Sequence, residues 1–359
     1  MAAKLKTLFW LFLPFGIIHL LIVRLRNILY DLNIFKSRRL PNPVISVGNI
    51  QMGGTGKTPI TIEIIKELQK SGYRIGVLSR GYKRKAIGQV ILNDKDKNED
   101  LEMPALIGDE PSLIIRHLKN GFLGIDKNRF SAARNILQKD NVDFFILDDG
   151  FQHRKLHRDL DICLIDTSCW QNHPYLFPYS NLRDSKSSLK RADILILTKY
   201  SDESLESAQL KSHLQMKYKI PVLTANILVS RIYDCKNNRI INPADLVGKK
   251  VAAFCGIAGP KSFFRMIEEE GIRIIYKKAY PDHYGYQEKD IQFIIEKAKT
   301  SGAQRLLTTE KDSVKLSKYL SWFFERGLSL YVIGIKIRIN DIDYLMRKIY
   351  EIIEDRSSA

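Results

Sequence analysis

Short apolar runs alternate with amphipathic stretches along most of the chain after residue 40. Runs without any polar position are typical of strands that are covered on both faces, and stretches with a helical period are typical of the helices that cover them. The pattern predicts strands at 43–47, 74–79, 144–147, 162–165 and 194–197, and helices at 58–71 and 108–118. We therefore expect an α/β fold with a mostly parallel sheet and helices on both faces.

The rhythm changes near Pro221. Two β-type runs, 222–227 and 230–233, are followed by a polar Lys-Asn-Asn turn, which predicts an extended β-hairpin linker. A second, smaller α/β unit follows, with expected strands at 251–255, 273–276, 305–308 and 328–333. The chain should thus divide into four parts: an N-terminal helix at 1–40, a nucleotide-binding domain at 41–220, the linker at 221–245 and a C-terminal domain at 246–359. The charged stretch 83–104 is expected to be a long, mobile loop.

The N-terminal segment is apolar and flanked by positive charge. Residues 8–23 contain no formal charge, and a helix of this length rises about 24 Å, which is short of the roughly 30 Å hydrocarbon core. Apolar residues then continue along one helix face at positions 21, 25, 28, 29 and 32. We expect a helix that lies in the membrane interface, with its basic residues near anionic head groups. A helix packed on the protein core is the alternative.

The net charge of +17 is high, whereas the hydrophobic content of 45% and the charged content of 27% are ordinary for a globular protein. Residues 1–40 alone carry seven basic side chains against one acidic, a balance of +6. This concentration favours a membrane surface over nucleic acid as the partner of the positive charge. Four cysteines without a C-x-x-C pair favour a reducing, cytoplasmic compartment: Cys163, Cys169, Cys235 and Cys255.

A glycine-rich turn joins the first predicted strand to the first predicted helix in the run 46–59, SVGNIQMGGTGKTP. Backbone N–H groups of such a turn and the helix N-terminus bind phosphate, so the run indicates an ATP site. The expected ATP-binding residues are Gly53, Gly54, Thr55, Gly56, Lys57 and Thr58. Lys57 would reach the β- and γ-phosphates, and the Thr58 hydroxyl would bind Mg²⁺. Gln51 stands where the usual motif has glycine.

Acidic residues follow other predicted elements. Asp148 and Asp149 come directly after the apolar run 144–147, at the sheet edge where ligands bind in α/β proteins. Carboxylates in this position hold Mg²⁺ in P-loop enzymes, although strand-end aspartates also cap turns. Asp109 and Glu110 open a predicted helix, for which capping is the simpler explanation. His283 follows a predicted strand, and a lone histidine is more often structural than catalytic.

Together these motifs resemble those of the tetraacyldisaccharide 4'-kinases, the membrane-bound P-loop kinases of lipid A biosynthesis. The matching runs lie in order between residues 46 and 316: SVGNIQMGGTGKTP, LSRGYKRK, GDEP, ILDDGFQHRKLHRDLDICLID, LKRADILILTK, AFCGIAGPKSFF, YPDHY and LLTTEKDSVKL. One segment departs from the family pattern Pro-Ala-Gly-Pro-Leu-Arg-Glu, since residues 178–184 read Pro-Tyr-Ser-Asn-Leu-Arg-Asp.

The resemblance implies transfer of the ATP γ-phosphate to the 4'-hydroxyl of a tetraacylated glucosamine disaccharide 1-phosphate. It assigns Asp109 as the base and His283 as its partner. It also implies a Mg²⁺ site made of Thr58, Asp148, Asp149 and Glu110, and substrate contacts from Arg80, Tyr82, Gln152 and His153. The expected partners are the lipid disaccharide and the cytoplasmic face of the bacterial inner membrane, with no protein partner and no nucleic acid.

A membrane-associated P-loop ATPase switch that acts on protein partners is the alternative function. Such switches often carry a lysine directly before the two glycines of the loop. Met52 occupies that position here, which argues against a switch.

Overall fold

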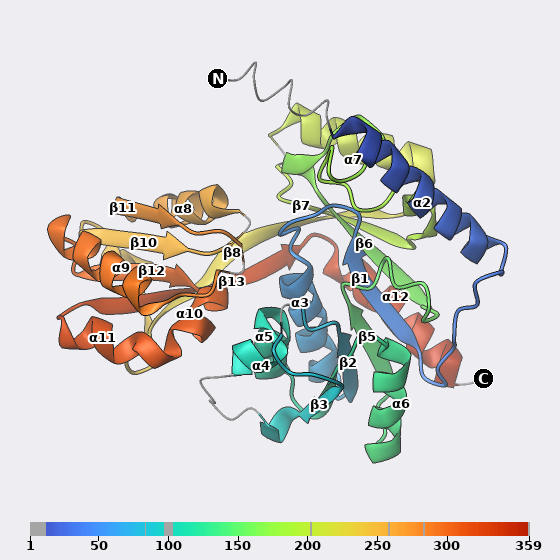
Figure 1. The fold of residues 1–359 in the computed structure, drawn as a ribbon, viewed down its shortest axis with the longest axis horizontal. Helices are drawn as coiled ribbons and strands as arrows, with labels where there is room; N and C mark the ends of the chain where they lie inside the picture. Colours follow the sequence, from blue (N-terminus) through green and yellow to red (C-terminus); the bar gives the residue numbers. More distant parts are fainter. Residues whose placement is uncertain are drawn as a thin grey trace.

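The computed structural model describes residues 12–82, 84–96, 103–201, 203–257, 259–282 and 284–357. They form two lobes built on one sheet, which runs through both lobes (Figure 1). The first lobe contains the parallel strands β1 (Val44–Asn49), β2 (Ile75–Ser79), β4 (Gly121–Ile125), β5 (Phe144–Asp148), β6 (Leu160–Asp166) and β7 (Ile194–Thr198). The predicted mostly parallel α/β fold is therefore confirmed.

Helices cover both faces of the first lobe. Its helices are α2 (Leu13–Asp31), α3 (Lys57–Lys70), α4 (Met103–Ile107), α5 (Asp109–His117), α6 (Arg129–Lys139), α7 (Leu205–Tyr218) and α12 (Ile342–Ser357). The core on one face contains side chains from α3, α5 and α12, and α2, α6 and α7 contribute to the opposite face. Three short 3-10 helices lie in its loops: η1 (Asp94–Asp96), η2 (Thr167–Cys169) and η3 (Lys186–Arg191).

The second lobe is a smaller α/β unit, as expected. Its strands are β10 (Val251–Cys255), β11 (Ile274–Ala279), β12 (Arg305–Thr309) and β13 (Ser329–Ile339), and its helices are α8 (Pro260–Glu269), α9 (Glu288–Thr300), α10 (Glu310–Leu316) and α11 (Leu320–Glu325). Two 3-10 helices, η4 (Pro243–Leu246) and η5 (Ser317–Tyr319), complete it. β10, β11, β12 and β13 pair in parallel, and helices cover both of their faces.

The two lobes are joined by long antiparallel strands. β8 (Val222–Asp234) is one continuous strand and pairs with β13 over most of its length, from Tyr331 opposite Asp234 to Ile339 opposite Ala225. The predicted hairpin is present only as a short pairing of β8 with β9 (Ile240–Ile241). The main partner of β8 lies about a hundred residues away in sequence, so local turn signals did not reveal it. The strand order is β11-β10-β12-β13-β8-β7-β6-β1-β5-β2-β4-β3.

After β13 the chain returns to the first lobe. Side chains of α12, including Leu345 and Ile349, share a core with Ile60 and Ile64 of α3. This packing places residues 342–357, which the sequence pattern assigns to the C-terminal domain, beside the nucleotide-binding domain. The predicted domain boundaries at residues 40, 220 and 245 stay a prediction.

The stretch expected to be a loop, 83–104, contains regular structure. β3 (Val90–Asn93) pairs antiparallel with β4 at the edge of the sheet, and η1 follows it. The expectation of a loop throughout was therefore wrong, because an edge strand of four residues gives little periodic signal. Residues 83 and 97–102 lie outside the described part of the chain.

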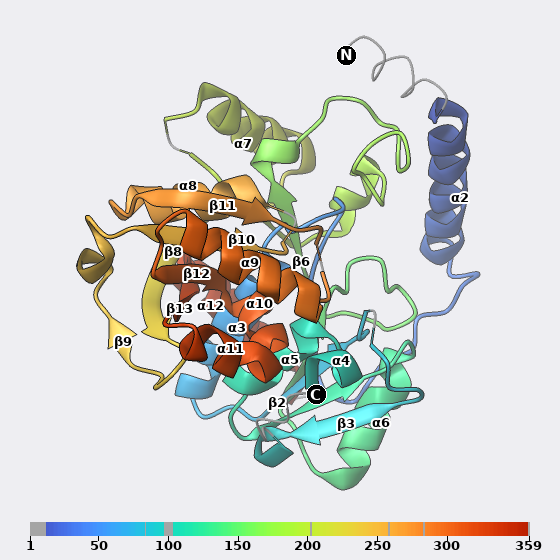
Figure 2. The same cartoon turned by 60° about the vertical axis from the view of Figure 1, so that its left-hand side comes forward.

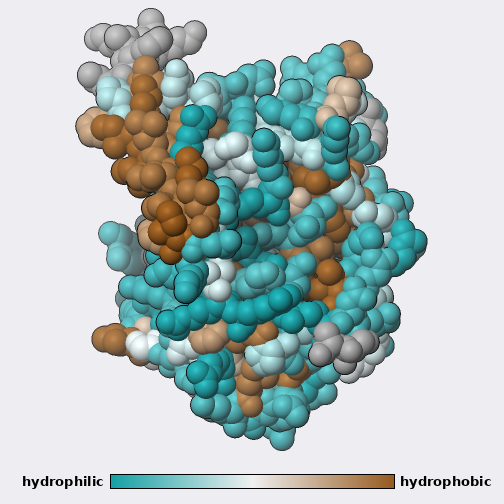
Figure 3. Space-filling view, turned by 90° about the vertical axis from the view of Figure 1, so that its right-hand side faces the viewer, coloured by the Kyte–Doolittle hydropathy of each residue, from teal (hydrophilic) through white to brown (hydrophobic). Residues whose placement is uncertain are grey.

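α2 presents two different faces. Gly16, Leu20, Val23 and Asn27 are buried against the first lobe. The other face carries apolar side chains that are more than half exposed: Phe15, Ile18, Leu21, Ile22, Leu25, Ile28 and Leu32. Figure 3 shows this face as an apolar ridge on an otherwise mostly hydrophilic surface, and Figures 1 and 2 place the helix on the outside of the lobe. By length and composition α2 could cross a membrane. Its inner face packs on the core, as the alternative expected, and its place in the membrane interface stays a prediction.

Candidate active site

The carboxyl ends of β1, β5 and β2 meet at one edge of the sheet, and the predicted phosphate loop lies there. Gly53 and Gly56 adopt φ angles of 101° and 89°, which side chains with a Cβ rarely tolerate. Gly56 is the N-cap of α3, so Lys57 and Thr58 begin the helix. The amide of Asn49 at the end of β1 donates to the Thr55 hydroxyl at 2.6 Å. The predicted strand, turn and helix are thus formed as a phosphate-binding loop requires.

Gln51, the departure from the usual motif, has a structural role. Its side chain is fully buried, where Nε2 donates to the Asp166 carbonyl at 3.0 Å and Oε1 accepts from the Asp166 N–H at 2.8 Å. This pair of bonds fastens the segment between β1 and the glycines of the loop to the end of β6. The glutamine therefore supports the loop through its side chain.

Asp149 lies between two cations. Lys57 Nζ is 3.6 Å from Asp149 Oδ1, and Arg183 binds both carboxylate oxygens, with Nη1 3.0 Å from Oδ2. Arg183 Nη2 also donates to the Asn49 side chain. Burial tends to raise the pKa of Asp149, but Lys57 and Arg183 outweigh it and hold that pKa well below its usual range. Asp149 is therefore ionised and positions Lys57.

Asp148 has a different environment. It is 1% exposed and accepts a hydrogen bond from Thr61 at 3.3 Å. Burial, with smaller contributions from the charges of Glu110 and Asp149, raises its pKa to about 7. A cation beside this carboxylate would relieve that repulsion.

The predicted Mg²⁺ ligands come from three elements: Thr58 from the start of α3, Glu110 from α5, and the Asp148 and Asp149 pair from the end of β5. Among the described residues no three His, Cys, Asp or Glu side chains are arranged to hold a metal by themselves. Mg²⁺ commonly takes one or two protein carboxylates and completes its shell with phosphates and water, and its binding by these four residues stays a prediction.

Asp109 lies at the contact between the lobes. It begins α5, and its Oδ2 is 2.9 Å from Lys315 Nζ of α10 in the second lobe. Lys315 is also 3.7 Å from Asp312, which is fully buried and accepts from the Gly256 N–H at 2.9 Å. The sequence did not single out Lys315, although it lies within one of the matching motifs. His283 lies outside the described residues, so its pairing with Asp109 stays a prediction.

The four residues expected to contact the substrate differ in their surroundings. Gln152 donates to the Asn49 carbonyl at 2.8 Å, so it supports the end of β1. Arg80 and Tyr82 are exposed directly after β2, at the same edge of the sheet. His153 is partly buried, and burial together with nearby Arg129 lowers its pKa to about 3. Their contacts with a substrate stay a prediction.

Arg129 is a further positive side chain that sequence analysis missed. It begins α6 just beyond β4 and is only 5% exposed, and its Nε has no hydrogen-bond partner among the described residues. Burial lowers its pKa, while Asp149 acts to raise it and Arg80 to lower it. No spacing or motif marks this arginine, because only the fold brings it close to the two aspartates.

Comparisons with known proteins identify the family of this chain. A family model described as tetraacyldisaccharide-1-P 4'-kinase matches residues 8–354. Two proteins named tetraacyldisaccharide 4'-kinase are similar: one from Pelobacter propionicus is 37% identical over 311 residues, covering 87% of this chain and 84% of its own, and one from Desulfotalea psychrophila is 34% identical over 348 residues, covering 96% and 97%. The crystal structure of LpxK from Aquifex aeolicus in complex with ATP has a TM-score of 0.73 and 29% identity, covering 96% of this chain and 99% of that one. The chain therefore belongs to the tetraacyldisaccharide-1-P 4'-kinase family.

Proposed function

We propose that this kinase carries out its reaction where the phosphate loop, residues 53–58, meets the carboxyl end of β5. As a member of its family the chain is an ATP-dependent kinase that phosphorylates the 4'-hydroxyl of the tetraacylated glucosamine disaccharide 1-phosphate of lipid A biosynthesis. The observation that carries the placement is Lys57 at the first turn of α3, held 3.6 Å from Asp149. ATP is the ligand of the Aquifex aeolicus relative, and we extend it to this site.

Each group at the carboxyl-end edge of the sheet has a role that suits phosphoryl transfer. The N–H groups of the loop and the N-terminus of α3 bind the phosphates, and Lys57 neutralises charge on the transferring group. Asp109 accepts the proton of the sugar hydroxyl, with His283 as its partner. Arg80, Tyr82 and His153 lie where the acceptor would approach, and Arg129 adds positive charge to the same region.

Thr58, Asp148 and Glu110 would hold Mg²⁺, with Asp149 close by. When bound, this ion neutralises charge on the β- and γ-phosphates. The raised pKa of Asp148 supports this role, because a carboxylate that is buried and also lies near like charge gains most from a cation.

The lipid acceptor is reached from a membrane surface. The apolar face of α2 inserts into the interface, and basic residues of the N-terminal segment contact anionic head groups. Since ATP is cytoplasmic, we place the protein on the cytoplasmic face of the bacterial inner membrane, as a peripheral or monotopic protein. The alternative function, an ATPase switch, has no support from the comparisons.

The test is transfer of label from γ-labelled ATP to the lipid disaccharide, followed by extraction into organic solvent. Lys57→Ala should lower kcat by about 100-fold or more, because it removes the cation that stabilises the transferring phosphoryl group. The matched control is Lys70→Ala at the exposed far end of the same helix, which should keep normal kcat. A Lys57→Ala enzyme with near-normal turnover would show that ATP reacts elsewhere.

A further inference from the structure

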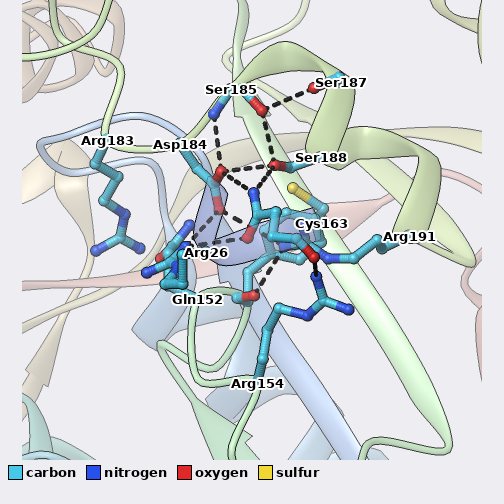
Figure 4. Close-up of polar contacts among 12 residues, drawn as sticks. Arg26, Gln152, Arg154, Cys163, Arg183, Asp184, Ser185, Ser187, Ser188 and Arg191 are labelled. Atoms are coloured by element: carbon cyan, nitrogen blue, oxygen red, sulfur yellow. Dashed lines mark hydrogen bonds and ion pairs between the residues drawn. The ribbon is translucent and has the colours of Figure 1, made fainter. Parts of the chain in front are cut away.

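A buried carboxylate, Asp184, contacts Ser188 of η3 and Arg26 of α2 (Figure 4). Its Oδ1 accepts hydrogen bonds from Asn27 of α2 at 3.2 Å and from Ser188 of η3 at 2.6 Å. Its Oδ2 is 3.6 Å from both Arg26 and Arg191. The Asp184 side chain is fully buried, so these groups are the environment that keeps its charge inside the protein.

The residues just before Asp184 are bonded to residues 50–52, which lead from β1 into the phosphate loop. We call residues 181–184 the strap. The Met52 N–H donates to the Asn181 carbonyl at 2.5 Å, and the Arg183 N–H donates to the Ile50 carbonyl at 2.9 Å. The Arg183 side chain then binds Asn49 and Asp149, as described above. The strap is therefore bonded through its backbone to residues 50–52, just before the phosphate loop, and through the Arg183 side chain to Asp149, the carboxylate that positions Lys57.

Arg154 and Gln152 form a second chain of hydrogen bonds between α2 and the end of β1. Arg154, which follows β5, donates to the Asn27 carbonyl at 2.9 Å and to Asp31 at 2.7 Å, both in α2. Gln152, two residues earlier, donates to the Asn49 carbonyl. Both connections thus begin at Asn27 and end at Asn49, the residue that also binds the Thr55 hydroxyl in the phosphate loop.

The exposed and the buried face of α2 make different contacts. Its exposed face is apolar, whereas Asn27 is the polar residue among the four that are buried on its inner face. A buried amide is costly unless it is hydrogen-bonded, and a bond to a carboxylate fixes its geometry more strictly than apolar packing does. The inner face therefore sets the position of α2 relative to the strap without contributing to the apolar ridge.

We propose that Asp184 is a positioning residue for phosphoryl transfer, and that its bond with Asn27 couples the lipid-facing helix to the nucleotide site. The contacts of the Asp184 side chain fix the backbone of the strap. The strap in turn positions Arg183, which binds Asp149, and Asp149 positions Lys57. This inference rests on the proposed function of that site. Small displacements of charged groups at a phosphoryl-transfer site carry large rate effects, since the reaction depends on positioning.

The experiment compares Asn27→Ala, Asp184→Asn and Asp184→Glu in the full chain, with labelled ATP and lipid disaccharide in detergent micelles. Asn27→Ala and Asp184→Asn should each lower kcat by about 10- to 100-fold at a temperature well below their Tm. Partition into vesicles of anionic phospholipid should stay normal in both, because the apolar face is intact. Asp184→Glu, which keeps the charge, should retain more kcat than Asp184→Asn. Asn33→Gly, an exposed change just beyond α2 where φ is 56°, is the control and should behave as wild type.

The combined Asn27→Ala and Asp184→Asn variant tests the coupling itself. If the two residues act as one unit, the double variant should lose little more kcat than the worse single variant. Folded single variants with wild-type kcat, or a lower Tm with unchanged kcat, would show a merely structural contact and overturn the inference. In either case an inactive Lys57→Ala enzyme would leave the proposed function standing, whereas a wild-type chain that labels no lipid would refute that function itself.

Discussion

The neighbouring aspartates 148 and 149 show how differently adjacent residues are placed by a fold. Asp148 is the last residue of β5, and its side chain lies inside the protein beside Thr61. The backbone of Asp149 has a φ of 53°, and its carboxylate contacts Lys57 and Arg183. One pKa is therefore raised and the other lowered. The sequence predicts two acids at this edge but does not distinguish them, because the cations that make them differ come from distant segments.

His153 makes the free energy of unfolding depend on pH. Its folded pKa of about 3 lies below the ordinary value of 6.5, so the unfolded state binds the extra proton between these limits. The stabilisation is complete above pH 6.5 and is lost as pH falls toward 3. His153→Gln should therefore flatten the loss of stability between pH 7 and pH 5 by about 1–2 kcal/mol, as measured by urea denaturation at each pH.

The matched control for this prediction is His213→Gln on the exposed surface of α7, which makes the same change of residue type away from the site. The same His153→Gln protein also tests the expected substrate contact. A normal KM for the lipid would remove His153 from the acceptor site, and a pH profile identical to wild type would contradict the depressed pKa.

At the scale of elements, α2 and the strap are the least expected features. The periodicity of residues 21–32 predicted an amphipathic helix, and α2 has the corresponding exposed apolar face. Its inner face could not be read in the same way, since a single asparagine in an apolar stretch gives no sign of its partner. The strap lies in the segment that departs from the family pattern, and its backbone bonds to residues 50–52 appear only in three dimensions.

The apolar face of α2 should be required for membrane association. Replacing Ile18, Ile22 and Leu25 together with serine removes three side chains that are 54%, 60% and 58% exposed, so folding should be little affected. Partition into vesicles of anionic phospholipid should fall by about 1,000-fold or more, because each of the three side chains contributes roughly 1.5–3 kcal/mol when it leaves water. Leu205→Ser, at a 79% exposed position on α7, is the control for loss of one exposed leucine. Unchanged partition of the folded triple variant would show that this ridge does not bind the membrane.

At the scale of the whole molecule, the active site depends on how two lobes meet. β8 and β13 carry the sheet from one lobe into the other, and α10 places Lys315 against Asp109 of the first lobe. The ion pair holds the proposed base at the lobe contact. The segment around His283 follows β11 of the second lobe, so the expected dyad would draw its two members from different lobes.

Asp109→Asn and His283→Ala should each lower kcat by about 100-fold or more, with ATP affinity largely unchanged, if they act together on the acceptor proton. Their double variant should then lose little beyond the worse single one. Asp343→Asn, an exposed aspartate on α12, is the control. Losses that multiply fully, or a His283→Ala enzyme with normal kcat, would end the dyad and leave the kinase assignment intact. A role of Asp109 in capping α5 or in Mg²⁺ binding would instead appear as a lower Tm or a greater Mg²⁺ requirement.

The sequence by itself determined most of the strands in both lobes, the helices α3 and α5, the phosphate loop and the acids at the end of β5. Each of these depends on contiguous residues: unbroken apolar runs form covered strands, and glycines permit the turn that binds phosphate. Only the tertiary structure decided the pairing of β8 with β13, the return of α12 to the first lobe and the partners Gln51–Asp166, Arg183–Asp149 and Lys315–Asp109. These contacts join segments that are distant in sequence, and their energy comes from burial and charge pairing that no local pattern encodes.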